Sequence, residues 1–143
     1  MNGDERNRLE AMRAPEISSQ LQLALDAHGG WSRKNGETTL YLLGIGDCLD
    51  WHRIVGDDEE WAHVAGGPLA LSLSPDGHDA SAHILGRGIA GGDMTHATVL
   101  DGHWRTAEPL GEWVLMERRT REGVNREDAP AGWRPVPREP AHS

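Results

Sequence analysis

Hydrophobic and polar side chains alternate in short runs between residues 38 and 117, and turn residues separate these runs. The clearest run is 68–74, where leucines occupy every second position before the turn Pro75-Asp76-Gly77. Alternation with a period of two is typical of a strand with one buried face, and such a turn favours a hairpin. The pattern predicts strands over residues 38–43, 51–55, 60–65, 68–74, 83–86, 96–100, 103–107 and 113–117.

No helical pattern interrupts these runs, and many short strands at regular spacing indicate a β-sandwich or barrel. Before them, Ile17–Ala27 has apolar residues at helical spacing and ends at His28-Gly29-Gly30, so we expect a helix there. Residues 1–14 are charged and predict a loose helix or a flexible segment, and 31–37 is polar and turn-rich. Residues 125–143 are rich in proline and predict a tail with little regular structure.

Composition narrows the class of protein. A chain of 143 residues indicates one domain, and its net charge of −9 disfavours binding to nucleic acid. The basic residues are Arg apart from Lys34, a bias that indicates a GC-rich, bacterial source. A single cysteine, Cys48, excludes an intrachain disulfide and a Cys-x-x-Cys zinc site. Without a signal-peptide pattern or a long apolar run, we expect a cytoplasmic protein that does not bind membranes.

Residues that can carry chemistry gather in Gly46–Gly66. This stretch predicts two short strands joined by an acidic turn. His52 lies on the first strand, and Glu59, Trp61 and His63 alternate along the second. Alternation sends these three side chains to one face of the strand. An acid, an indole and an imidazole on one face are unusual for an outer surface, so the face is a plausible lining for a binding cavity.

The spacing of Gly46, His52, Ile54, Glu59 and Gly66 is similar to that of the first cupin motif. The chain resembles in particular the fifth cupin family, which was long filed as a domain of unknown function. The shared elements are Leu42-Leu43, Trp51-His52-Arg53, Asp58-Glu59-Glu60-Trp61, Gly66-Gly67-Pro68-Leu69, Leu85-Gly86 and Gly102-His103-Trp104-Arg105-Thr106-Ala107. The resemblance implies an all-β cupin barrel, a jelly-roll-like double-stranded β-helix with a short N-terminal helix, over residues 15–124. It also implies a homodimer.

The chain departs from the family pattern at the metal ligands. The resemblance implies that a metal-binding cupin supplies three His and one Glu, a set that suits divalent transition metals. Here Ile54 and Arg105 stand at two of the His positions, and neither side chain can ligate a metal. We therefore expect no metal and no other cofactor. If a metal is bound, its candidate ligands are His52, Glu59 and His63.

The retained His52 and Glu59 are expected to face each other inside the barrel. A carboxylate beside an imidazole raises the imidazole pKa and creates a proton shuttle near neutral pH, and Arg105 would hold an anionic oxygen of the substrate. The expected pocket wall consists of Trp51, Ile54, Trp61, His63 and His96. This arrangement favours a metal-independent enzyme that isomerises, epimerises, dehydrates or cyclises a small organic molecule, with bacterial secondary metabolism as the expected setting.

Other interpretations stay open. The same pocket could serve a non-catalytic small-molecule-binding protein or a metal-dependent oxygenase or isomerase. Glu59 and Arg105 could instead form a buried ion pair to which His52 is merely hydrogen-bonded. Arg118, Arg119 and Arg121, at the end of the last predicted strand, could anchor an anionic ligand or pair with surface acids.

Overall fold

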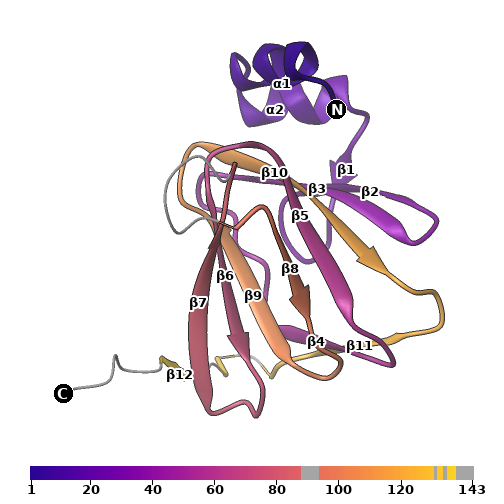
Figure 1. Ribbon diagram of the computed structural model, residues 1–143, viewed down its shortest axis with the longest axis vertical. Helices are drawn as coiled ribbons and strands as arrows, with labels where there is room; N and C mark the ends of the chain where they lie inside the picture. The colour runs from indigo at the N-terminus through magenta and orange to yellow at the C-terminus, as the bar shows by residue number, and fades with distance from the viewer. Residues whose placement is uncertain (88–93, 131, 134, 138–143) are drawn as a thin grey trace.

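The computed structural model describes residues 1–87, 94–130, 132–133 and 135–137. In this part of the chain, two six-stranded sheets face each other as the sides of a flattened barrel (Figure 1). The first sheet consists, in spatial order, of β1 (Ala24–Leu25), β2 (Trp31–Asn35), β3 (Thr38–Gly44), β10 (Trp113–Thr120), β5 (Glu59–Gly66) and β8 (His96–Val99). The second consists of β11 (Asn125–Asp128), β4 (His52–Val55), β9 (Trp104–Pro109), β6 (Leu69–Ser74), β7 (Asp79–Leu85) and β12 (Val136–Pro137).

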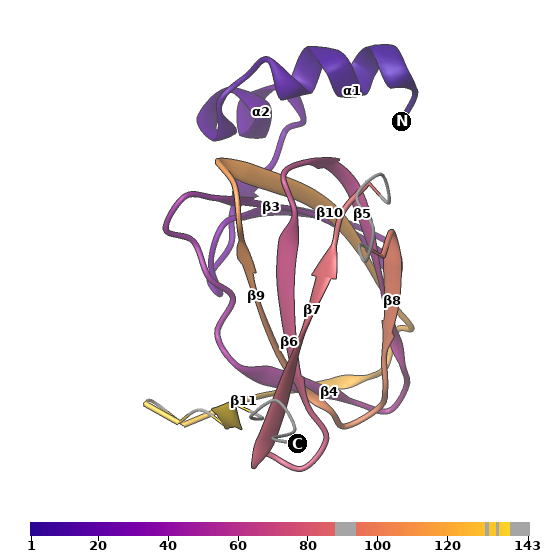
Figure 2. The same cartoon turned by 60° about the vertical axis from the view of Figure 1, so that its left-hand side comes forward.

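Two helices, α1 (Gly3–Glu10) and α2 (Ala14–Gln20), pack against the first sheet on the side away from the second sheet (Figures 1 and 2). Their apolar side chains meet the outward residues of β3, β5 and β10. The buried members of this layer are Leu9, Ala14, Ile17, Leu42, Ala65, Trp113 and Leu115. No helix in the described ranges is both long enough and apolar enough to cross a membrane.

Apolar side chains fill the middle of the barrel, because alternate residues of each strand point inward. The buried members are Tyr41, Leu43, Leu49, Trp61, Leu69, Leu71, Leu85, Val99, Ala107, Val114 and Met116. The alternating leucines of β6 therefore face the core, as their spacing predicted. This packing occupies much of the interior that the sequence suggested as a ligand cavity.

The predicted all-β jelly-roll fold is confirmed, and each of the eight predicted strands overlaps an observed one. The extent of the predicted helix over 17–27 is wrong. Helix α2 ends at Gln20, because Gln22 adopts a left-handed conformation (φ 57°) and the Leu23 N–H donates to the Ser18 carbonyl at 2.8 Å. These contacts close the helix end. The polar residues expected in a turn form β2 instead, because β3 supplies their hydrogen-bond partners.

Both ends of the chain carry more regular structure than their composition suggests. Residues 1–14 were expected to be a loose helix or a flexible segment; α1 forms there and buries Leu9, and the Arg6 guanidinium donates to the Val64 carbonyl at 3.1 Å. In the expected tail, β11 pairs antiparallel with β4, and β12 lies parallel to β7. Both differences arise because distant strands supply partners that the local sequence does not reveal. The domain division at residues 15 and 124 stays a prediction.

Strand β5 contains an irregularity that places its two halves against different layers. Its pairing with β10 shifts between Leu115 and Met116, so that Trp61 faces the barrel interior while Ala65 faces the helices. Gly66 ends the strand at φ +89°, and a Cβ there would lie 2.6 Å from the Trp113 ring. Both the backbone conformation and the lack of space require glycine at this position.

Replacing Gly66 by alanine should lower the free energy of unfolding by at least about 3 kcal/mol, since backbone strain and overpacking add. Gly36→Ala is the matched control, because Gly36 has φ +65° but no atom within 4 Å of its added Cβ. The control should lose only about 1 kcal/mol, the strain of a left-handed backbone. Urea denaturation of both variants measures the difference. Equal losses would show that Trp113 does not restrict this position.

Candidate functional site

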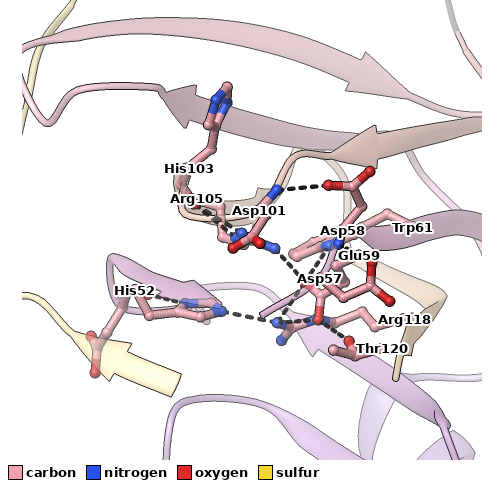
Figure 3. A network of polar contacts seen from close by, with 11 residues as sticks. His52, Asp57, Asp58, Glu59, Trp61, Asp101, His103, Arg105, Arg118 and Thr120 are labelled. Atoms are coloured by element: carbon pink, nitrogen blue, oxygen red, sulfur yellow. Dashed lines mark hydrogen bonds and ion pairs between the residues drawn. The ribbon is translucent and has the colours of Figure 1, made fainter. Parts of the chain in front are cut away.

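Four polar or charged side chains meet inside the barrel near β4, at the end away from the helices (Figures 1 and 3). His52 begins β4, Glu59 begins β5, and the other two are Arg105 of β9 and Arg118 of β10. Their exposed fractions are 0%, 2%, 0% and 6% in that order. Burying charges is costly unless they are paired and hydrogen-bonded. The partners of these groups therefore decide what the site can do.

Glu59 is the centre of this network (Figure 3). Its Oε1 accepts hydrogen bonds from Arg105 Nη1 at 2.9 Å, Arg118 Nη2 at 3.0 Å and Trp61 Nε1 at 2.7 Å. Its Oε2 accepts from Arg118 Nη2 at 3.2 Å and from the Thr120 hydroxyl. With this many donors around it, the carboxylate cannot take up a proton without losing bonds to its partners.

Both ring nitrogens of His52 are also engaged. Nδ1 lies 2.8 Å from the Asp50 carbonyl oxygen, and Nε2 lies 2.9 Å from Arg118 Nη2. A guanidinium can only donate, so Nε2 must accept and Nδ1 must carry the proton. These partners assign His52 as a neutral imidazole of one tautomer.

The electrostatics keep His52 neutral and Glu59 ionised. Burial, followed by the charge of Arg118, lowers the pKa of His52 far below its usual value. Burial alone would raise the pKa of Glu59, but the charges of Arg118 and Arg105 outweigh it and lower that pKa to about 2. Burial likewise lowers the pKa of Arg105, and Glu59 opposes this. Glu59 raises the His52 pKa, as expected, but burial and the charge of Arg118 outweigh it, so the expected proton shuttle near neutral pH is wrong.

The remaining predicted residues lie in different places. Ile54 and Trp61 are buried and face the interior. His63 donates from Nε2 to a backbone carbonyl at 2.9 Å and does not join the network. His96 is exposed and bonds to the hydroxyl of the preceding threonine, so it lies outside the interior. Trp51 lines a separate pocket.

Arg118 is the main contributor that the sequence analysis did not place in the site. It was expected to anchor an anion or to pair with surface acids, yet it bridges His52 and Glu59. The ion pair between Glu59 and Arg105 is present at 2.9 Å, but His52 bonds to Arg118 rather than to that pair. Continuing the alternation from the inward Met116 would have placed Arg118 inside the barrel.

A pocket of about 710 Å³, which we call the outer pocket, lies beside the second sheet. Part of its lining comes from β6 and β9, at positions that alternate with core residues: Ala70, Ser72, Thr106 and Glu108. The loop before β4 and the C-terminal segment add most of the rest, including Cys48, Asp50, Trp51, Asp128 and Trp133, and His28 completes one side. The rings of Trp51 and Trp133 meet edge to face at 5.9 Å. This volume is in the range of small-molecule sites.

A model of the cupin superfamily (DUF985) matches residues 10–121. The chain belongs to the cupin superfamily. A search of curated proteins finds no match to this chain.

Solved structures agree on the fold of this cupin. A Shewanella oneidensis protein has a TM-score of 0.72 at 22% identity, with 82% of this chain and 85% of that chain covered. A hypothetical protein from Leishmania major has a TM-score of 0.64 at 18% identity, with 75% and 80% covered. Bacillus subtilis oxalate decarboxylase, which has Mn(II) centres, has a TM-score of 0.58 at 14% identity, with 76% of this chain but 30% of that chain covered. At these identities the likeness shows the fold alone.

The donor set inside this cupin does not fit a metal ion. No three His, Cys, Asp or Glu side chains of the described residues form a group that could hold one, so His52, Glu59 and His63 do not come together as a ligand set. Ile54 and Arg105, which the resemblance places at two of the metal-ligand positions, cannot ligate a metal. Arg105 adds a fixed positive charge that would repel a cation, and the lone pair of His52 Nε2 is occupied by Arg118.

Removing the charge of Glu59 tests the network. Glu59→Gln should lower the free energy of unfolding by about 3–5 kcal/mol, because it leaves two buried guanidinium groups without their counter-ion. Glu127→Gln is the matched control, since Glu127 pairs with Arg53 at 3.0 Å on the surface, where a pair contributes about 1 kcal/mol or less. Chemical denaturation at pH 7 compares the two. A loss below about 1 kcal/mol in both would contradict the central role of Glu59.

The low His52 pKa predicts acid sensitivity that begins near pH 6.5. Below that pH the unfolded chain binds a proton at His52 and the folded chain does not, so stability falls by up to about 1.4 kcal/mol per pH unit. Below about pH 4.5, Glu59 adds to the loss, since its carboxylate is protonated first in the unfolded chain. His52→Gln should flatten the slope between pH 6.5 and 5, whereas His78→Gln, at an exposed position, should not. Denaturation at stepped pH measures the slopes, and a wild-type slope in His52→Gln would refute the assignment.

Proposed function

We propose that this cupin is a binding protein for a small organic molecule, and that the ligand lies in the outer pocket. The observation that carries the proposal is that pocket of about 710 Å³, lined by two indoles and several polar side chains. The interior network does not offer an equivalent place, since His52 and Glu59 are buried and already bonded to protein partners.

The lining of the outer pocket indicates the chemistry of its ligand. Trp51 and Trp133 present aromatic surface against which a flat or apolar face packs well. The carboxylates of Asp50, Glu108 and Asp128 offer hydrogen-bond acceptors to hydroxyl or amino groups. A molecule with one apolar face and several hydrogen-bond donors, such as a sugar-like compound, fits this combination.

An acid–base enzyme working through His52 and Glu59 is the second candidate. It is favoured by the position of Arg118 Nη2, which lies 2.9 Å from His52 and 3.0 Å from Glu59 and so links the two groups. An isomerase, lyase or cyclase of this kind would have to break these bonds in order to free the imidazole. The binding proposal needs no such rearrangement.

A ligand screen on the full chain tests the proposal. Sugars, nucleosides and aromatic acids are added in a thermal-shift assay, and compounds that raise the melting temperature by mass action are measured by calorimetry. Trp51→Ala and Glu108→Gln should each weaken binding at least tenfold. Trp31→Ala is the control, since Trp31 lines a separate pocket of about 390 Å³, and it should leave the affinity within twofold.

Two results would overturn the proposal. The first is a ligand whose affinity survives both Trp51→Ala and Glu108→Gln, which would place it elsewhere. The second is a hit that the protein converts to product in a reaction abolished by His52→Gln. That result would favour the acid–base enzyme.

A further inference from the structure

A second pocket, of about 390 Å³, lies where α2 begins, beside the end of β3 and the start of β10, at the end of the barrel that carries the helices (Figure 2). We call it the helix pocket. None of its described lining residues also lines the outer pocket, so binding there is independent of the proposed function. Its volume is near the lower end of the range for small-molecule sites, which suits a compact ligand.

Apolar side chains form much of the wall of the helix pocket. Trp31 and Trp113 present two indoles, and the Trp113 Nε1–H donates to the Met12 carbonyl at 3.1 Å, which holds that ring in place. Ile45 lines the same pocket although it is 78% exposed. Apolar surface of this kind gains free energy when a ligand covers it. The wall therefore favours a ligand with an aromatic or aliphatic group.

The space in the helix pocket depends on Gly44, which lines it at the end of β3. Its backbone is outside the left-handed region, so the conformation itself does not require glycine. A Cβ at this position would lie 3.2 Å from Ala14 Cβ, 3.5 Å from Asp47 Oδ2 and 3.6 Å from the Trp31 ring. The missing side chain thus leaves room between α2, the loop after β3 and the indole.

The helix pocket carries both signs of charge. Its charged lining residues are Arg13, Asp47 and Glu112. Asp47 Oδ2 accepts from the Gly44 N–H at 2.8 Å, which fixes that carboxylate beside the pocket. No ion pair between residues that the structure describes involves Arg13 or Glu112. One guanidinium and one carboxylate at the pocket are therefore available to a ligand.

We infer that the helix pocket binds a free amino acid with an aromatic or large apolar side chain. The ligand carboxylate would accept two hydrogen bonds from Arg13, and its ammonium group would donate to Glu112 and Asp47. The ligand side chain would pack against Trp31 and Ile45. A simple acid would meet two carboxylates of its own sign, and a simple amine would leave Arg13 unused. A zwitterion matches both signs of charge.

Phenylalanine and two blocked analogues serve as probes in a nuclear magnetic resonance titration of the isotope-labelled full chain. Phenylalanine should shift the indole N–H signals of Trp31 and Trp113 and leave those of Trp51 and Trp133 unchanged. Phenylalaninamide lacks the carboxylate and N-acetylphenylalanine lacks the ammonium group. Each should bind at least threefold more weakly, as expected when an exposed charge pair is lost.

Charge variants assign each end of the ligand. Arg13→Gln should weaken phenylalanine at least threefold and leave phenylalaninamide within twofold, because the amide has no carboxylate to lose. Glu112→Gln should weaken phenylalanine to a similar extent and leave N-acetylphenylalanine within twofold. Arg33→Gln is the control, since Arg33 is exposed on β2 and is not part of the helix pocket, and it should change none of the three affinities.

Gly44→Ala is the steric test, because it occupies space in the pocket and removes no lining group. It should weaken phenylalanine at least tenfold, whereas Gly3→Ala, where an added Cβ meets no atom within 4 Å, should not. Trp31→Ala gives a second test of the same wall and should also weaken phenylalanine at least tenfold. Melting temperatures show that each variant is folded at the temperature of the titration.

Four results would overturn the inference. The first is the absence of any shift at Trp31 and Trp113 up to the solubility limit of phenylalanine. The second is an analogue that binds as tightly as phenylalanine, since the charges would then play no part. The third is a shift of Trp51 and Trp133 instead, which would place the amino acid in the outer pocket and support the proposed function. The fourth is a wild-type dimer that Ile45→Ser converts to a monomer in size-exclusion chromatography, which would show that a second copy of the chain covers the pocket.

Discussion

The shared carboxylate of Glu59 joins the two sheets of the barrel. Glu59 and Arg118 belong to the first sheet, whereas Arg105 and His52 belong to the second. The Glu59–Arg105 and Arg118–His52 bonds, both at 2.9 Å, therefore cross the interior, and the Glu59–Arg118 pair at 3.0 Å connects them within the first sheet. Each guanidinium is too costly to bury alone, and each is buried because Glu59 compensates it. Such a network contributes less to net stability than to the choice of one arrangement, because alternatives would leave a charge unpaired. The positions of β4, β5, β9 and β10 are thereby tied to one another.

This network changes what a cupin interior can do. In the metal-binding pattern that the sequence resembles, this region would supply lone pairs to a cation, and the motif spacing places Ile54 and Arg105 at two of those positions. Beside the Arg105 guanidinium, Glu59 acts as a counter-ion. The apolar core residues fill the rest of the barrel interior. Recognition of a larger molecule is then left to a surface such as the outer pocket, where the loop before β4 meets the C-terminal segment.

The alternation of residues and the spacing of motifs were sufficient to predict the parts of this fold that depend on neighbouring residues in the sequence. The leucines of β6 and the inward direction of Arg105 followed from alternation and motif spacing, and both are observed. Strands β2 and β11 were missed because their polar sequences become strands only through pairing with β3 and β4. The His52 pKa was misjudged for a similar reason, since burial within the folded barrel lowers it most, and the charge of Arg118, 66 residues away in the chain, lowers it further. The outer pocket could not be foreseen, because its walls come from segments with no pattern in common.

The C-terminal segment also affects how this protein meets other molecules. Strands β11 and β12, which pair with β4 and β7, are the edge strands of the second sheet. The edge strands of the first sheet are β1, with two residues, and β8, with four. Short edge strands offer another chain few free backbone groups to pair with, which protects a β-protein from aggregation through strand addition. A dimer of this cupin, which its sequence leads us to expect, would accordingly be held by side chains on the sheet faces rather than by a continuous intermolecular sheet.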